Sequence, residues 1–136
     1  MAGVEFLSAE WLASARELLG GLPPRPGASA RIQHIVSGGP GGDVALDLTF
    51  EDGRLMDASL VPGATPDPAA ELTITTTYPD TLRWASGDLD LSVAVMRGQA
   101  KVAGAMGALL AFLPVTRTPE FRTALAALHE RTVPPA

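Results

Sequence analysis

The segment SGDLDLSVAVMRGQAKVAGAMG, residues 86–107, decides the fold that this chain is expected to adopt. Four glycines divide it into short stretches, and nearly every residue between them is apolar or acidic. Glycine ends helices and opens turns because it adopts backbone conformations that other residues avoid. The segment therefore predicts short apolar elements joined by tight turns.

The centre of this segment is compatible with two structures. Leucine and valine alternate with other residues from Leu89 to Val95, and strict alternation is typical of a strand. A segment that is apolar on all sides is also typical of a short buried helix, here capped by Asp88 or Asp90 and ended by Gly98. Periodicity alone does not distinguish the strand from the helix.

The chain after this centre predicts one strand and two helices. Residues 99–103 are expected to form a strand, and residues 106–113 a helix that Pro114 ends, because proline lacks the amide hydrogen. Thr118-Pro119-Glu120 predicts the start of a last helix, with a capping hydroxyl, a proline in the first turn and an acidic residue near the positive end of the helix dipole.

The chain before the segment predicts a helix, four strands and a second helix. Ser8 is expected to cap a helix over residues 9–19, whose apolar residues recur at helical spacing. Alternation predicts strands at residues 31–37, 43–50, 54–61 and 71–77, and Pro79 suits the first turn of a helix that ends at residue 85. The side chains expected to face inward are Ile32, His34, Val36, Val44, Leu46, Leu48, Phe50, Met56, Ala58, Leu60, Leu72 and Ile74.

This order of elements predicts a single α+β domain over residues 1–136, with helices packed on one face of a mostly antiparallel sheet. Apolar residues make up 46% of the chain and charged residues 18%, as expected of a globular protein. The domain is long enough to bury a core of its own.

The charge and the residue types exclude several classes of function. The net charge is −5, so nucleic acid is not an expected partner, and contact with an anionic membrane is expected to be transient at most. The chain has no cysteine, which excludes disulfides and thiolate chemistry and fits a cytoplasmic protein. His34 and His129 have no carboxylate at ligand spacing, so neither a metal site nor any other cofactor is predicted.

Two further patterns have a structural interpretation that is simpler than a catalytic one. The glycine-rich residues 37–42 lack the lysine and hydroxyl of a phosphate-binding loop and are expected to join two strands. Asp47 and Asp57 face each other across two predicted strands, as paired catalytic carboxylates do. Both are expected to point to solvent, so a solvated polar face is the preferred interpretation.

His34 is the one polar side chain that the pattern places on an inward face. A core histidine that is hydrogen-bonded to a neighbour explains it without any function. A histidine inside a cavity would instead bond the polar group of a ligand or act as a general base. Both interpretations stay open from the sequence.

The segment from residue 86 to residue 107 also resembles the signature of the sterol carrier protein type two family. The resemblance lies in Ser86-Gly87 followed by acidic residues and leucine, in the Met-x-Gly step at Met96, and in Lys101-Val102 followed by Gly104, Met106 and Gly107. Weaker similarity extends from Ile32 to Phe112, with alanines at 103 and 105 where the family often has charged or polar residues. The composition, rich in Ala, Gly, Pro and Arg, suggests a bacterial member that stands alone as one domain.

The resemblance implies a five-stranded, mostly antiparallel sheet with an apolar tunnel between the sheet and the helices. It also implies that the centre of the segment is the short helix that ends at Gly98, and not a strand. The ligand would be a lipid or another apolar small molecule. The expected ligand-binding residues are Leu46, Leu48, Phe50, Met56, Ile74, Trp84, Met96, Val102, Met106, Leu109, Leu110 and Phe112 in the wall, Phe121 and Leu125 at one end, and His34 as the polar group.

Three hypotheses about function follow. The first is a carrier that binds and transfers a lipid or another apolar molecule without catalysis. The second is a small cyclase or isomerase that acts on an apolar intermediate, with His34 as its acid or base. The third is an interaction module whose apolar face is covered by a partner; the protein itself is expected to be a monomer or a homodimer.

Overall fold

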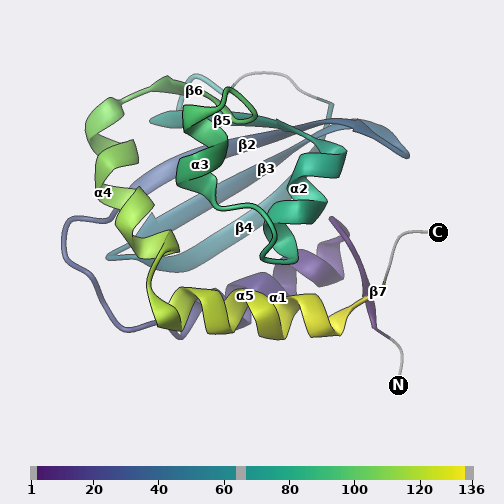
Figure 1. Ribbon diagram of the computed structural model, residues 1–136, viewed down its shortest axis with the longest axis horizontal. Helices are drawn as coiled ribbons and strands as arrows, with labels where there is room; N and C mark the ends of the chain where they lie inside the picture. Colours follow the sequence, from purple (N-terminus) through teal and green to yellow (C-terminus); the bar gives the residue numbers. More distant parts are fainter. Residues whose placement is uncertain (1–2, 64–66, 134–136) are drawn as a thin grey trace.

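The computed structural model describes residues 3–63 and 67–133 of the chain. Its central sheet has the strand order β4-β3-β2-β5-β6, and only the pair of β2 with β5 is parallel (Figure 1). The sheet consists of β2 (Ala30–Gly39), β3 (Gly42–Glu51), β4 (Arg54–Pro62), β5 (Leu72–Thr77) and β6 (Lys101–Gly104). The predicted five-stranded, mostly antiparallel sheet is therefore confirmed.

The described helices cover one face of this sheet, which confirms the predicted α+β class. They are α1 (Ala9–Gly20), α2 (Tyr78–Ala85), α3 (Leu91–Met96), α4 (Met106–Thr116) and α5 (Pro119–Arg131). Figure 1 shows α2, α3 and α4 in front of the strands, with α1 and α5 side by side below them. A short parallel pair of strands, β1 (Val4–Glu5) and β7 (Thr132–Val133), joins the two ends of the described chain.

Side-chain caps explain where several helices begin. The Ser8 hydroxyl accepts a hydrogen bond from the backbone N–H of Trp11 and opens α1, and the Thr118 hydroxyl does the same for Phe121 at the start of α5. The Asp90 carboxylate caps α3 by accepting from the N–H of Ser92. Residues 91–96 are thus the short helix of the two alternatives, and their alternation does not reflect a strand.

The register of the sheet places the expected residues on one inner face. His34 lies opposite Leu46 of β3 and opposite Ile74 of β5. Residues paired across a sheet share a face, so these side chains point toward the helices together. The inward direction of His34 is confirmed by this pairing and by its burial, with 9% of its surface exposed.

The expected direction of Met56 is wrong, because β4 contains a bulge. Thr49 pairs with Asp57 and Phe50 pairs with Leu55, which leaves Met56 as an extra residue without a partner. A bulge reverses the alternation of side chains beyond it. Leu55 therefore takes the inward position at the start of the strand, and Met56 points outward with 48% of its surface exposed.

The outer face of the sheet is less solvated than the sequence suggests. Ala45 on β3 is fully buried, and Oδ1 of Asp47 is buried with no hydrogen-bond partner among the described residues. Asp67, in the connection from β4 to β5, donates its backbone N–H to the buried Gln33 side chain and forms an ion pair with Arg31. Asp67 thus lies against this face. Asp47 is on the outer face as predicted, but it is only partly exposed.

Two predicted boundaries shift by a few residues. The fifth strand of the sheet spans Lys101–Gly104 instead of residues 99–103. Helix α4 continues through Pro114 to Thr116, so the prediction that Pro114 ends the helix is wrong. Pro114 removes only one helical hydrogen bond, the one that a backbone N–H at this position would donate to the backbone oxygen of residue 110, so the helix continues for two more residues.

Gly104 offers a test of this packing, because its φ is +114° and a Cβ there would overlap the backbone oxygen of Glu71. We expect Gly104→Ala to lower the free energy of unfolding by about 2 kcal/mol or more. Gly107→Ala is the matched control, since Gly107 lies in α4 with open space around it and alanine favours a helix. Urea unfolding of both variants checks the prediction, and equal stabilities would contradict it.

Candidate functional site: an apolar cavity between the sheet and the helices

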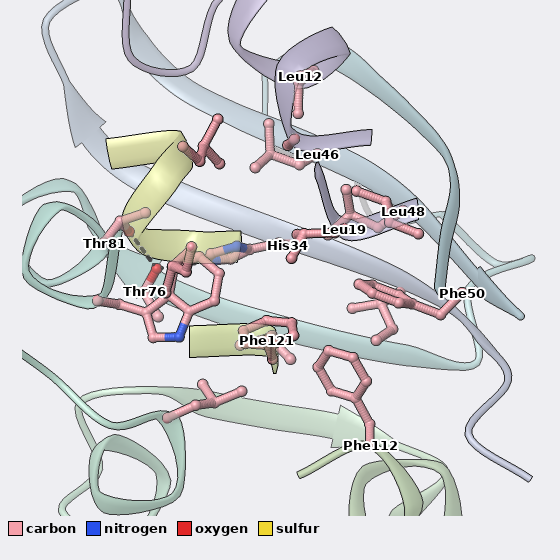
Figure 2. A pocket seen from close by; sticks show the side chains of 18 of the residues that line it. Leu12, Leu19, His34, Leu46, Leu48, Phe50, Thr76, Thr81, Phe112 and Phe121 are labelled. Carbon is pink, nitrogen blue, oxygen red and sulfur yellow. Dashed lines mark hydrogen bonds between the residues drawn. The ribbon is translucent and has the colours of Figure 1, made fainter. Parts of the chain in front are cut away.

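A cavity of about 70 Å³ lies between the inner face of the sheet and the helices that cover it (Figure 2). Pockets that bind small molecules commonly have volumes of roughly 300–1,000 Å³, so this cavity is small. The wall is formed by Trp11, Leu12, Ala15, Leu19, Ile32, His34, Leu46, Leu48, Phe50, Leu55, Ile74, Thr76, Asp80, Thr81, Trp84, Leu89, Leu91, Ala94, Phe112, Phe121, Leu125 and Leu128. Apolar side chains dominate this wall, and the polar ones are few.

Nine of the residues that the sequence analysis selected lie in this wall. They are His34, Leu46, Leu48, Phe50, Ile74, Trp84, Phe112, Phe121 and Leu125. They come from three strands and three helices, so the fold brings together residues that are far apart in the sequence. Their role in binding a ligand stays a prediction.

The other six selected residues lie elsewhere. Four are exposed: Met56 at 48%, Met96 at 87%, Met106 at 49% and Leu110 at 68%. Leu109 is buried in the core, and the partly buried Val102 packs against the core. Neither residue lines the cavity. The idea that methionines line the cavity therefore has no counterpart in this structure, since none of the wall residues is a methionine.

Helix α1 and the start of α2 supply wall residues that the sequence analysis did not select. The apolar stripe of α1 consists of Trp11, Leu12, Ala15 and Leu19. The sequence revealed this stripe but did not indicate that it faces the cavity. Thr76 continues the inward alternation of Leu72 and Ile74 on β5, so the same spacing marks it as inward. No spacing marks Thr81, and the direct passage from β5 into α2 brings its hydroxyl to that of Thr76, which contacts His34.

His34 is held by a chain of three short hydrogen bonds. Its Nε2 lies 2.7 Å from Oγ1 of Thr76, which lies 2.6 Å from Oγ1 of Thr81. The Thr81 hydroxyl in turn donates to the backbone oxygen of Thr77 over 2.7 Å. Figure 2 shows Thr76 and Thr81 beside the ring of His34 at one side of the cavity, with Phe50 and Phe112 at the other.

Burial keeps the His34 ring neutral. It lowers the pKa of His34 from 6.5 to about 4, because the charged ring would lose its hydration inside the domain. The partner at Nε2 is a hydroxyl and not a carboxylate, so it does not compensate a positive charge. Trp84 contacts the ring edge-on, with the two ring centres 6.4 Å apart.

Asp80 is the only residue in the wall that is ordinarily charged at neutral pH. It lies in the first turn of α2, and its carboxylate pairs with Arg83 on the same helix at 3.7 Å. Among the described residues no group of His, Asp and Glu is arranged to hold a metal ion. In the same described part of the chain, every helix is too short or too polar to cross a membrane.

No family model matches the chain, and no curated protein matches it. Several solved structures, in contrast, do match the chain. The protein TT1886 from Thermus thermophilus has a TM-score of 0.67 at 17% identity, covering 100% of this chain and 96% of its own. A crystal structure of sterol carrier protein 2 has a TM-score of 0.68 at 19% identity, covering 95% of this chain and 100% of its own.

The chain has the sterol carrier protein 2 fold. Sterol carrier protein 2 like 2 from Aedes aegypti gives a further match, with a TM-score of 0.60 at 13% identity, covering 78% of this chain and 93% of its own. The resemblance inferred from residues 86–107 is thus confirmed at the level of the fold. In the sterol carrier protein 2 fold of this chain, the cavity lies between the sheet and the helices, where the resemblance places a tunnel.

The lowered pKa of His34 predicts a specific pH dependence of stability. The unfolded chain takes up a proton on this residue below pH 6.5, whereas the folded chain does so only near pH 4. The free energy of unfolding should therefore have its full value above pH 6.5 and fall by about 3 kcal/mol as the pH is lowered to 4. Each unit of difference between the two pKa values contributes about 1.36 kcal/mol. Urea unfolding of the wild type and of His34→Leu across this range measures the difference.

The exposed His129 provides the control for this measurement. His129→Leu should keep the pH dependence of the wild type, while His34→Leu should lose the part that falls between pH 6.5 and 4. If both variants followed the wild type, the His34 ring would not be buried in the neutral form.

Proposed function

We propose that the protein binds an apolar small molecule of the lipid class between the inner face of its sheet and the covering helices. The observation that supports this most directly is the cavity itself, whose wall is apolar except for His34, Thr76, Thr81 and Asp80. Removing a hydrocarbon from water into such a wall is favourable by about 0.8 kcal/mol per methylene.

The structural neighbours agree with this proposal. They share the fold, and one of them, sterol carrier protein 2 like 2 from Aedes aegypti, is described in a second structure as palmitated, with a TM-score of 0.60 at 15% identity. An acyl chain in that protein makes an acyl chain or a similar hydrocarbon a reasonable ligand class for this chain. Transfer of the ligand between sites is part of the proposal.

The size of the cavity limits what binds without a change of shape. The cavity of about 70 Å³ is smaller than the roughly 300–1,000 Å³ of usual ligand pockets, so a lipid-sized molecule requires the helices to separate from the sheet. Helix α3 has only six residues, and two of its apolar side chains, Val93 and Met96, already face solvent. We infer that the layer formed by α3 and α4 moves outward to admit the ligand.

The enzyme hypothesis has no observation that favours it over binding. A catalytic histidine base is commonly oriented by a carboxylate, whereas the described partner of His34 is the hydroxyl of Thr76. A neutral ring of low pKa is also a weak base. Binding is therefore the function that this geometry supports best.

Both tryptophans of the chain, Trp11 and Trp84, line the cavity, so their fluorescence reports directly on its contents. We expect titration with 1-octanol to change the tryptophan emission in a saturable manner. Native mass spectrometry of the freshly purified protein should in addition show bound apolar molecules that denaturation removes. The absence of both effects would contradict the proposal.

A pair of variants of α1 localises the binding. Ala15 is buried in the cavity wall, whereas Ala13 on the same helix is exposed. Ala15→Leu adds three carbon atoms to the cavity and should weaken binding of 1-octanol by about tenfold or more, the equivalent of about 1.4 kcal/mol or more. Ala13→Leu should bind like the wild type. Equal affinities of the two variants would place the ligand elsewhere.

A further inference from the structure

The two edges of the central sheet differ in how they are protected from pairing with another chain. Natural proteins protect an edge strand with bulges and charged side chains. Strand β4 has both, namely the bulge at Met56 and the residue Asp57, whose carboxylate accepts a hydrogen bond from the N–H of Ala58. Strand β6, at the opposite edge, pairs regularly with β5, and its one charged residue is Lys101 at its start. The edge at β6 is therefore the open one.

The register with β5 shows which backbone groups of β6 point to this open edge. The backbone N–H of Ala105 donates to the backbone oxygen of Glu71, which continues the ladder between β5 and β6. Successive residues of an antiparallel strand alternate between bonding the neighbour on one side and the neighbour on the other. The N–H and C=O groups of Val102 and Gly104 therefore point away from β5, to a side where none of the described strands lies.

These groups are complementary to those of a second copy of the same strand. Two antiparallel β6 strands related by a twofold axis at Ala103 place Val102 of each copy opposite Gly104 of the other. Both residues direct their N–H and C=O groups outward, so each such pair exchanges two hydrogen bonds, as in a regular antiparallel ladder. The edge is thus self-complementary, as a twofold interface requires.

We propose that the protein forms a homodimer in which the β6 strands of two copies pair around Ala103 and join both sheets into one. No residue of β6 lines the cavity, so this interface is separate from the proposed ligand site. The oligomeric state and ligand binding can therefore be tested independently.

The side chain on the twofold axis suits this pairing. Val102 packs toward the core, so by alternation its neighbour Ala103 lies on the outer face, where it is exposed. In the dimer Ala103 faces its own copy, with the two Cβ atoms roughly 5 Å apart. Two identical charged side chains would repel each other at that distance, whereas two alanines fit without cost.

The charges at the ends of the paired strands are complementary. The same register sets Lys101 of one copy beside Ala105 of the other, and Glu71 lies beyond Ala105 in the same row of the outer face. Two strand spacings separate the backbones of Lys101 and Glu71 by about 10 Å, which these long side chains span across the small alanine. Neither residue takes part in an ion pair within the described chain. The dimer would supply a counter-ion to both.

The start of α4 adds apolar surface to this interface. Helix α4 begins directly after Ala105, and Figure 1 shows it following β6 at the edge of the sheet. Antiparallel pairing of the β6 strands brings the starts of both α4 helices next to the partner strand. Met106 and Leu110 of this helix are 49% and 68% exposed, and burial of such apolar side chains drives association.

Sedimentation equilibrium of the intact protein tests the proposal, and we expect twice the chain mass of 14.1 kDa. Ala103→Lys sets two lysines opposite each other on the axis and should raise the dissociation constant of the dimer by about tenfold or more. Ser59→Lys is the matched control, because it adds the same charge to an exposed residue of β4, the other edge strand. This variant should remain a dimer, and circular dichroism verifies that both variants fold.

A charge reversal tests the register of the two strands. Lys101→Glu places like charges side by side at Glu71 of the other copy and should weaken the dimer, while the double variant with Glu71→Lys should restore it. Hydrogen exchange gives a second readout, because the amides of Val102 and Gly104 should be protected in the dimer and lose protection on dilution. The amide of Ala103, which faces β5, should not respond to dilution.

Three outcomes would overturn the proposal. The first is the mass of a single chain at every concentration measured. The second is a dimer that Ala103→Lys leaves as tight as Ser59→Lys does, since the copies would then meet elsewhere. The third is a double variant no tighter than Lys101→Glu alone. In each case the binding of an apolar ligand would stand or fall by its own tests.

Discussion

The parallel pairing of β2 with β5 is the constraint on which the site depends. It sets Ile74 opposite His34, and the next residue on the same face of β5 is Thr76, whose hydroxyl reaches the ring. Strand β5 then passes into α2 without a loop, with Thr77 as the capping residue. This strand pairing therefore determines the position of the buried histidine and its hydrogen-bond partner, Thr76.

The same pairing explains why the outer face of the sheet is partly covered. Strands β4 and β5 run in the same direction but are separated by β3 and β2, so the chain must cross these strands between them. The crossing leaves Asp67 bonded to Gln33 and paired with Arg31. The described helices lie on the opposite, inner face, where the cavity is (Figure 1).

Local signals in the sequence were sufficient for most of the fold. The caps at Ser8 and Thr118 and the alternation of residues 43–50 depend on near neighbours, so they can be recognised without tertiary structure. The outward direction of Met56 could not be recognised in this way, because the bulge depends on how β4 pairs with β3. The apolar run at residues 108–113 has no polar side, so nothing in it marked Leu110 as exposed.

The candidate site shows the same division between local and tertiary information. The alternation of its strand was enough to predict that His34 faces inward. The Thr76 hydroxyl that it contacts lies 42 residues further along the chain, in β5, and the Thr81 hydroxyl that contacts Thr76 lies in α2. Two solved structures of this fold that cover nearly the whole chain share only 17% and 19% of its residues. Beside the cavity, His34, Thr76 and Thr81 are joined by short hydrogen bonds that end on the backbone oxygen of Thr77, and these side chains come from β2, β5 and α2.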